Sequence, residues 1–127
     1  MLSPDDFRRI ALGMENAIES AHMGHPDFRA NGRIFATLHA DLQSGMVKLT
    51  PDQQREFVQE NRGSFSPEAG AWGRQGCTKV LLHAVDEDTL GEAMTLAWQN
   101  TAKAGPKRAT RAKRAKRSIR ARATGRR

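Results

Sequence analysis

The last 25 residues of this 127-residue chain have a composition that excludes them from a hydrophobic core. Residues 103–127 contain twelve Lys and Arg side chains and no Asp or Glu, and Ile119 is their only large apolar side chain. Ordering a residue costs roughly 1–2 kcal/mol, and a segment that buries so little apolar surface has nothing to offset that cost. The sequence therefore predicts a globular domain at residues 1–104, followed by a basic tail at residues 105–127 that is disordered when free.

The globular part and the tail carry charges of opposite sign. Residues 1–102 contain nine basic side chains against fourteen acidic ones, a net charge of −5, whereas the whole chain carries +7 at pH 7. A chain of this length has room for one domain with one core. We therefore expect one small acidic domain joined to a strongly cationic tail, and the sequence pI of about 10.5 reflects the tail.

Three features of the sequence bear on where the protein acts. No apolar stretch approaches the roughly 18–20 residues that a membrane-spanning helix needs. Residues 1–6 contain neither the basic region nor the apolar region of a secretory signal, and Cys77 has no second cysteine with which to form an intrachain disulfide. We expect a cytoplasmic protein with no membrane partner, and association with the nucleoid is one location open to it.

The first element is predicted to be a helix. Ser3 is a suitable N-cap, and Pro4 suits the first helical position. Apolar side chains then recur at steps of three and four residues as far as Ala21, which is the pattern of one buried helical stripe. Gly24 and Pro26 end the helix by His25.

A meander of three strands is predicted next. Residues 28–30 lead into Asn31-Gly32, a strong hairpin signal because both residues tolerate positive φ. Residues 33–39 have the β-branched and aromatic content of a strand, with Phe35 on the opposite face from Ala36. Residues 46–49 supply the third strand.

The second half contains two more helices and one more strand. Thr50 is predicted to cap a helix that runs to residue 61 or 62, and residues 64–76 are expected to form a loop. Residues 77–83 then form the last strand, and Asp86 caps a closing helix that carries a regular apolar stripe. The predicted fold class is α+β, with an antiparallel sheet of about four strands and three helices packed mainly on one face.

Several short segments of the first hundred residues form a recognisable pattern, which resembles the MmcQ/YjbR family of small bacterial proteins. The resemblance covers about residues 3–102 and implies a CyaY-like fold. It also implies DNA binding, because that fold is similar to a "double wing" DNA-binding domain. Cys77 departs from the pattern, since family members often carry an aromatic residue there. The matching segments are the opening helix, His22-x-Gly24-x-Pro26-x-Phe28, residues 33–38, residues 47–51, Trp72-Gly73-Arg74-Gln75-Gly76 and the closing helix.

The tail predicts contact with nucleic acid, with DNA preferred over RNA. Its cations neutralise phosphates and release counterions, so about 6–10 contacts would lower the affinity roughly 10³–10⁵-fold between 50 and 200 mM salt. Such contacts are independent of base sequence. Two alternatives remain open: a tail that binds an acidic surface, its own or another protein's, and a tail with little function. The predicted phosphate-binding residues are Lys107, Arg108, Arg111, Lys113, Arg114, Lys116, Arg117, Arg120 and Arg122.

The domain itself offers a second set of basic residues that would line one face near Phe35 and Trp72. A strand with an outward Arg or Lys is more often a solvated sheet face than a binding site, and this alternative stays open. The candidate contacts in the domain are Arg29, Arg33, Lys48, Trp72, Arg74 and Lys79.

Catalysis and metal binding have little support in the sequence. His22 and His25 flank a turn, and their spacing of three lacks the helical His-x-x-x-His arrangement of many zinc enzymes. His39 and His83 end strands that could converge, but ordinary hydrogen bonds at turns and strand ends explain all four histidines more simply. Cys77 and His83 lie six residues apart on one predicted strand, which separates them by roughly 20 Å. We therefore predict a non-enzymatic protein with no cofactor and no metal, taken as a monomer although its oligomeric state is open.

A different class of function also remains open. The sheet face or the loop around Trp72 would then bind a protein or a small ligand, with the tail serving only for localisation. A pocket lined by His22, His39, Trp72 and Arg74 would favour this alternative.

Overall fold

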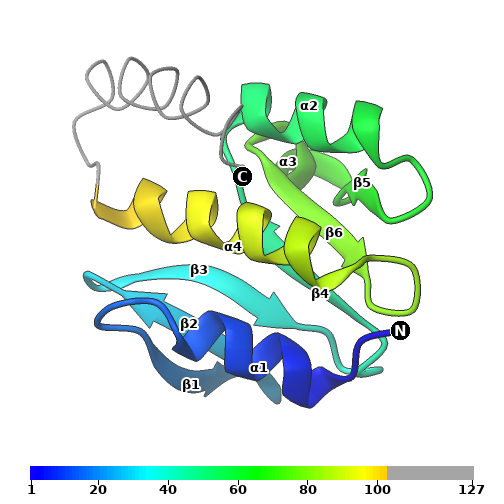
Figure 1. Cartoon of the computed structure of the whole chain (residues 1–127). Helices are drawn as coiled ribbons and strands as arrows, with labels where there is room; N and C mark the ends of the chain where they lie inside the picture. Colours follow the sequence, from blue (N-terminus) through cyan, green and yellow to red (C-terminus); the bar gives the residue numbers. More distant parts are fainter. Residues whose placement is uncertain (103–127) are drawn as a thin grey trace.

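The computed structural model describes residues 1–102, which form a six-stranded antiparallel sheet and four helices (Figure 1). The strand order is β1-β2-β3-β4-β6-β5. The predicted α+β class is confirmed, but the predicted numbers of about four strands and three helices are wrong. The elements are α1 (Pro4–Leu12), β1 (Ile18–His22), β2 (His25–Ala30), β3 (Arg33–Leu38), β4 (Ser44–Lys48), α2 (Pro51–Glu60), β5 (Phe65–Pro67), α3 (Gly70–Arg74), β6 (Cys77–Leu81) and α4 (Glu87–Ala102).

One face of the sheet carries the core. Helices α1 and α4 lie side by side across this face, over strands β2, β3 and β4 (Figure 1). Helix α2 reaches the same face, because the Gln54 side-chain amide contacts the Thr78 hydroxyl at 3.3 Å and Thr78 lies opposite the core residue Val47. The α4 stripe predicted from the sequence is buried at Leu90, Ala93, Met94 and Ala97.

The first helix is shorter than predicted. Its capping box forms as expected, because the Ser3 hydroxyl accepts from the Asp6 N–H and the Asp6 carboxylate accepts from the Ser3 N–H. The helix nevertheless ends at Leu12, and residues 18–22 form β1, which pairs along its whole length with β2. A two-residue turn at Met23-Gly24, with φ values of 51° and 82°, closes this hairpin. Pairing with β2 satisfies the inward-facing backbone groups of residues 18–22, and the helical spacing of their apolar side chains is overridden.

A β-bulge in the β2–β3 hairpin places Phe35 on the opposite face of the sheet from the predicted one. The Asn31-Gly32 turn forms as expected, with φ values of 56° and 76°. Phe28 pairs with Ala36 but Arg29 pairs with Ile34, so Phe35 is an extra residue without a partner in β2. The extra residue shifts the alternation by one position. Phe35 therefore lies in the core with 0% of its surface exposed, on the same side as Ala36.

The segment predicted as a loop, residues 64–76, contains β5 and α3. Phe65 anchors β5 in the core and pairs with Val80 of β6. Helix α3 begins at Gly70, whose φ is 69°, and a Cβ atom added at Gly73 would lie 1.8 Å from the Glu68 carbonyl oxygen. These two short elements depend on close backbone contacts, which apolar periodicity does not reveal. No helix of residues 1–102 is both long enough and apolar enough to cross a bilayer.

Candidate nucleic-acid interface

The nine predicted phosphate-binding residues of the tail lie outside the described residues, which end with α4 at Ala102. They stay a prediction from the sequence. The structure does show where the candidate contacts in the domain lie, and which of them it brings together.

Three of those candidates share the sheet face opposite α1 and α4, which we call the outer face. Strand pairing aligns Asp27, Thr37, Met46 and Lys79 in one row across β2, β3, β4 and β6. Side chains two residues apart on a strand point the same way, so Arg29 and Lys48 belong to this face as well. The outer face therefore presents three of the predicted cations: Arg29, Lys48 and Lys79.

The charge of Arg29 is already balanced within the domain. Its Nε and one terminal nitrogen donate to the two Asp27 carboxylate oxygens at 2.8 and 3.1 Å. His22 Nδ1 lies 2.7 Å from the same carboxylate, whose side chain is 0% exposed. The hydrogen bonds from Arg29 lower the pKa of Asp27 below its ordinary value, although burial acts in the opposite direction, and His22 adds to the lowering. Arg29 thus stabilises a buried carboxylate and offers less charge to a phosphate than its position suggests.

Arg33 and Phe35 do not belong to the outer face. Arg33 pairs with Ala30, which lies in the core, so its side chain leaves the sheet on the helix side. Phe35 is buried for the reason given above. The predicted face that combined Arg33 and Phe35 with the other candidates is therefore not formed.

Trp72 and Arg74 lie on α3, whose backbone is held firmly. The Gln54 side-chain amide donates to the Gly73 and Cys77 carbonyl oxygens, each at 3.0 Å. Trp72 is nevertheless 67% exposed, and Arg74 is exposed too. The helix thus holds a large aromatic side chain and a cation at the surface.

The basic residues of the domain divide into two groups. Four make ion pairs: Arg8 with Asp5 and Glu19, Arg9 with Asp6 and Glu87, Arg29 with Asp27, and Arg55 with Asp52. The other five make no ion pair with any residue of the described chain: Arg33, Lys48, Arg62, Arg74 and Lys79. Since these five are spread over three strands, one helix end and one turn, the domain offers scattered cations rather than one basic patch.

Two histidine–carboxylate pairs were missed from the sequence. Besides the His22–Asp27 pair, His39 Nε2 lies 2.8 Å from a Glu68 carboxylate oxygen, which joins the end of β3 to the segment after β5. The alternation of Asp27 and Arg29 on β2 was a signal for their own ion pair, whereas the His22–Asp27 contact depends on the β1–β2 hairpin. The His39–Glu68 contact spans 29 residues and leaves no local trace. Within residues 1–102 no three His, Cys, Asp or Glu side chains are grouped so that they could hold a metal ion.

Cys77 has the environment of a structural thiol. It is buried at the start of β6, and this burial raises the pKa of the thiol. A raised pKa keeps the sulfur protonated and unreactive at neutral pH. The predicted structural role of Cys77 is consistent with this environment.

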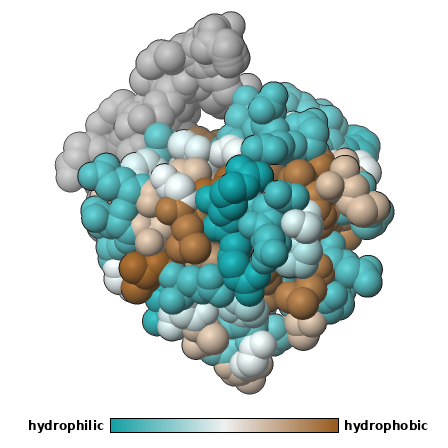
Figure 2. Space-filling model, turned by 60° about the horizontal axis from the view of Figure 1, so that its bottom comes forward, coloured by the Kyte–Doolittle hydropathy of each residue, from teal (hydrophilic) through white to brown (hydrophobic). Residues whose placement is uncertain are grey.

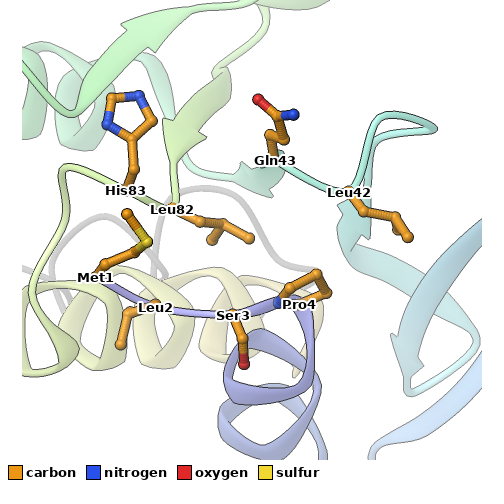
Figure 3. A pocket seen from close by; sticks show the side chains of 8 residues that line it. All are labelled: Met1, Leu2, Ser3, Pro4, Leu42, Gln43, Leu82 and His83. Carbon is orange, nitrogen blue, oxygen red and sulfur yellow. The ribbon is translucent and has the colours of Figure 1, made fainter.

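Two hollows lie away from these residues. One, of about 390 Å³, is mainly apolar and lies between the N-terminal segment, the β3–β4 loop and the end of β6 (Figure 3). The other, also about 390 Å³, lies between α2 and β5 and contains Arg55 and Arg62. Neither is lined by Trp72 or by His39. The mainly apolar hollow is lined by Met1, Leu2, Ser3, Pro4, Leu42, Gln43, Leu82 and His83.

The surface seen from below α1 mixes hydrophobic and hydrophilic areas (Figure 2).

Comparison with known proteins identifies the family. The fold is similar to the crystal structure of Deinococcus radiodurans protein DR2400, described as a DUF419 domain, with a TM-score of 0.70 at 20% identity over 89% of this chain and 88% of that chain. No curated protein matches the sequence. The YjbR family model matches residues 12–100, most of the described domain and more than half of the chain. The chain therefore belongs to the YjbR family.

Proposed function

We propose that this protein binds nucleic acid, with DNA preferred over RNA, and that the basic tail provides most of the affinity. The observation that carries the proposal is the separation of charge: residues 103–127 hold twelve cations and no carboxylate, whereas residues 1–102 have a net charge of −5. A cationic segment without internal carboxylates retains its full charge for phosphates. Contacts of this kind fix a protein on the backbone without reading bases.

The domain has a secondary role in this proposal. Four of its nine cations are neutralised by ion pairs, and the remaining ones do not form one patch. Lys48 and Lys79 on the outer face are the contacts that fit a phosphate backbone best, because they share a face and lack ion pairs in the described chain. We further propose that the protein is non-enzymatic and cytoplasmic.

The proposal is tested on the full chain with a variant that keeps its length. Replacing Arg111, Lys113, Arg114, Lys116 and Arg117 by Gln removes five of the twelve tail cations. We expect weaker binding of labelled duplex DNA by a similar factor for unrelated base sequences, measured by fluorescence anisotropy. The matched control replaces Arg33 and Arg62, two domain cations without ion pairs, and should bind nearly as the wild type does. Unchanged affinity in the five-residue variant would contradict the proposal.

One observation favours a second candidate function. Trp72 is 67% exposed although α3 is fixed by the contacts of Gln54, and an exposed aromatic side chain on a rigid element is typical of a binding anchor. In this candidate, α3 binds a protein or a small ligand, and the tail only localises the chain. A Trp72→Ala variant that binds DNA with wild-type affinity but loses a partner captured by the wild type would support it.

A further inference from the structure

The two edges of the sheet are protected to different degrees. The β5 edge is only three residues long and ends in Pro67, which lacks an N–H group. The β1 edge has five residues, all exposed, and pairs with β2 without a bulge (Figure 1, lower edge of the sheet). It contains neither Pro nor Lys, two residues that commonly protect an edge from pairing. β1 is therefore the edge at which a further strand can add.

The turn that precedes β2 determines which backbone groups of β1 point outward. His22 and His25 close a two-residue turn, so they form a hydrogen-bonded pair. Alternation along the strand then directs the N–H and C=O groups of Ser20 toward β2 and those of Glu19 and Ala21 away from the sheet. Pro26 lies opposite Ala21, where the ladder requires no N–H donor, which agrees with this assignment.

Side-chain contacts hold this edge in place although it is exposed. The Arg8 Nε lies 3.1 Å from the Glu19 carboxylate, which ties β1 to α1. At the other end, the His22–Asp27 pair ties β1 to β2. The outward backbone groups are thus presented by an ordered strand, and association loses little conformational freedom.

In one register of outward-facing groups, a second copy of the chain pairs with all five residues of this edge. Antiparallel pairing around a two-fold axis at Ser20 places Glu19 opposite Ala21 of the second copy, so that the outward groups of both strands meet. The two Ser20 residues face each other, and Ile18, which is 60% exposed, packs beside His22 of the second copy. Centring the axis on Glu19 would instead place two carboxylates directly opposite each other, which is unfavourable.

We propose that the protein self-associates through β1, in an antiparallel two-fold pair centred on Ser20 that joins both sheets into one. The pairing buries a small surface, so the dimer is weak and depends on concentration. Its two tails carry like charges, and salt that screens them favours association. The proposal does not depend on nucleic-acid binding.

The register can be tested by a disulfide in the full chain. In a pair of this kind the Cα atoms of the two facing Ser20 residues are about 4.5 Å apart, which lies within the range of roughly 4.4–6.8 Å that a disulfide accepts. A Ser20→Cys variant should therefore form a covalent dimer under mild oxidation at high salt. Ser66→Cys, on the exposed part of the opposite edge, is the matched control and should remain monomeric. Cys77 is buried and does not interfere.

A second measurement follows association without a covalent link. Sedimentation velocity over a concentration series should show wild-type chain and Ala21→Ser approaching the mass of a dimer. Ala21→Pro removes an outward N–H and should dimerise at least about tenfold more weakly, while its circular dichroism confirms the fold. A wild-type chain that stays monomeric throughout, equal cross-linking of the two cysteine variants, or a proline variant that associates as the wild type does would each overturn the proposal.

Discussion

Replacing Asp27 by alanine removes a buried carboxylate that binds two partners at once. Arg29 donates to both of its oxygens, and His22 Nδ1 lies 2.7 Å from one of them. A hydrogen bond to a charged group contributes about 1.5–3 kcal/mol to stability. Leaving a polar group without its partner adds a desolvation penalty, but this penalty is smaller when water can reach the group. Since the Arg29 and His22 side chains are both partly exposed, we expect the free energy of unfolding to fall by about 2–3 kcal/mol.

The loss should depend on pH in a defined direction. Because the pKa of Asp27 is lower in the folded protein than its ordinary value, the carboxylate stabilises the fold above its unfolded pKa of about 3.9. This contribution disappears as the pH falls through the folded pKa. The difference between the wild type and Asp27→Ala should therefore be full at neutral pH and shrink under strongly acid conditions.

Urea unfolding followed by circular dichroism measures both effects. The midpoint should shift at pH 7 with an unchanged denaturant slope, as expected when stability alone changes. Asp52→Ala is the matched control, because Asp52 is an exposed carboxylate that also pairs with an arginine, and it should cost less than about 1 kcal/mol. A loss for Asp27→Ala below that of the control, or one of equal size at neutral and strongly acid pH, would refute the reasoning.

Three further substitutions test the packing by the same unfolding measurement. Gly73→Ala places a Cβ against the Glu68 carbonyl and should destabilise the domain by about 2 kcal/mol or more. Its control, Gly91→Ala in α4, has open space around the new Cβ and should stabilise the domain by about 0.5–1 kcal/mol. Equal effects of the two substitutions on the free energy of unfolding would contradict the α3 geometry. Leu90→Ala empties a fully buried position and should cost about 2–5 kcal/mol, and a loss below 1 kcal/mol would show that Leu90 lies outside the core. Trp72→Ala should change stability by less than about 0.5 kcal/mol, and a larger loss would place Trp72 in a packed contact.

Local signals in the sequence predicted much of the fold. Both capping boxes, at Ser3 and at Thr50, form in the structure, and the Asn31-Gly32 turn closes the β2–β3 hairpin. The buried stripe of α4 also agrees with its spacing. Each of these features depends on residues a few positions apart, which is why one sequence sufficed to find them.

The errors arose where the pairing of strands overrides the apolar periodicity of a single segment. Residues 18–22 have apolar side chains at helical spacing, yet pairing with β2 makes them a strand. Phe35 lies in the core, contrary to the prediction, because β3 contains one residue more than the paired segment of β2. At the candidate site, Arg29 was found by its charge, but its pairing with Asp27 depends on the sheet face, and no periodicity argument shows that the carboxylate is buried. The tail stays a prediction that rests on composition.

The central claim is that the tail, and not the domain, provides the affinity for nucleic acid. Its most direct test is the salt dependence of duplex DNA binding by the full chain, compared with a chain ending at residue 102 whose circular dichroism shows a folded domain. We predict that the full chain loses roughly 10³–10⁵-fold in affinity between 50 and 200 mM salt if about 6–10 phosphates are contacted, and that the shortened chain binds too weakly to measure. A shortened chain with the affinity and the salt slope of the full chain would contradict the claim and assign the binding to the domain.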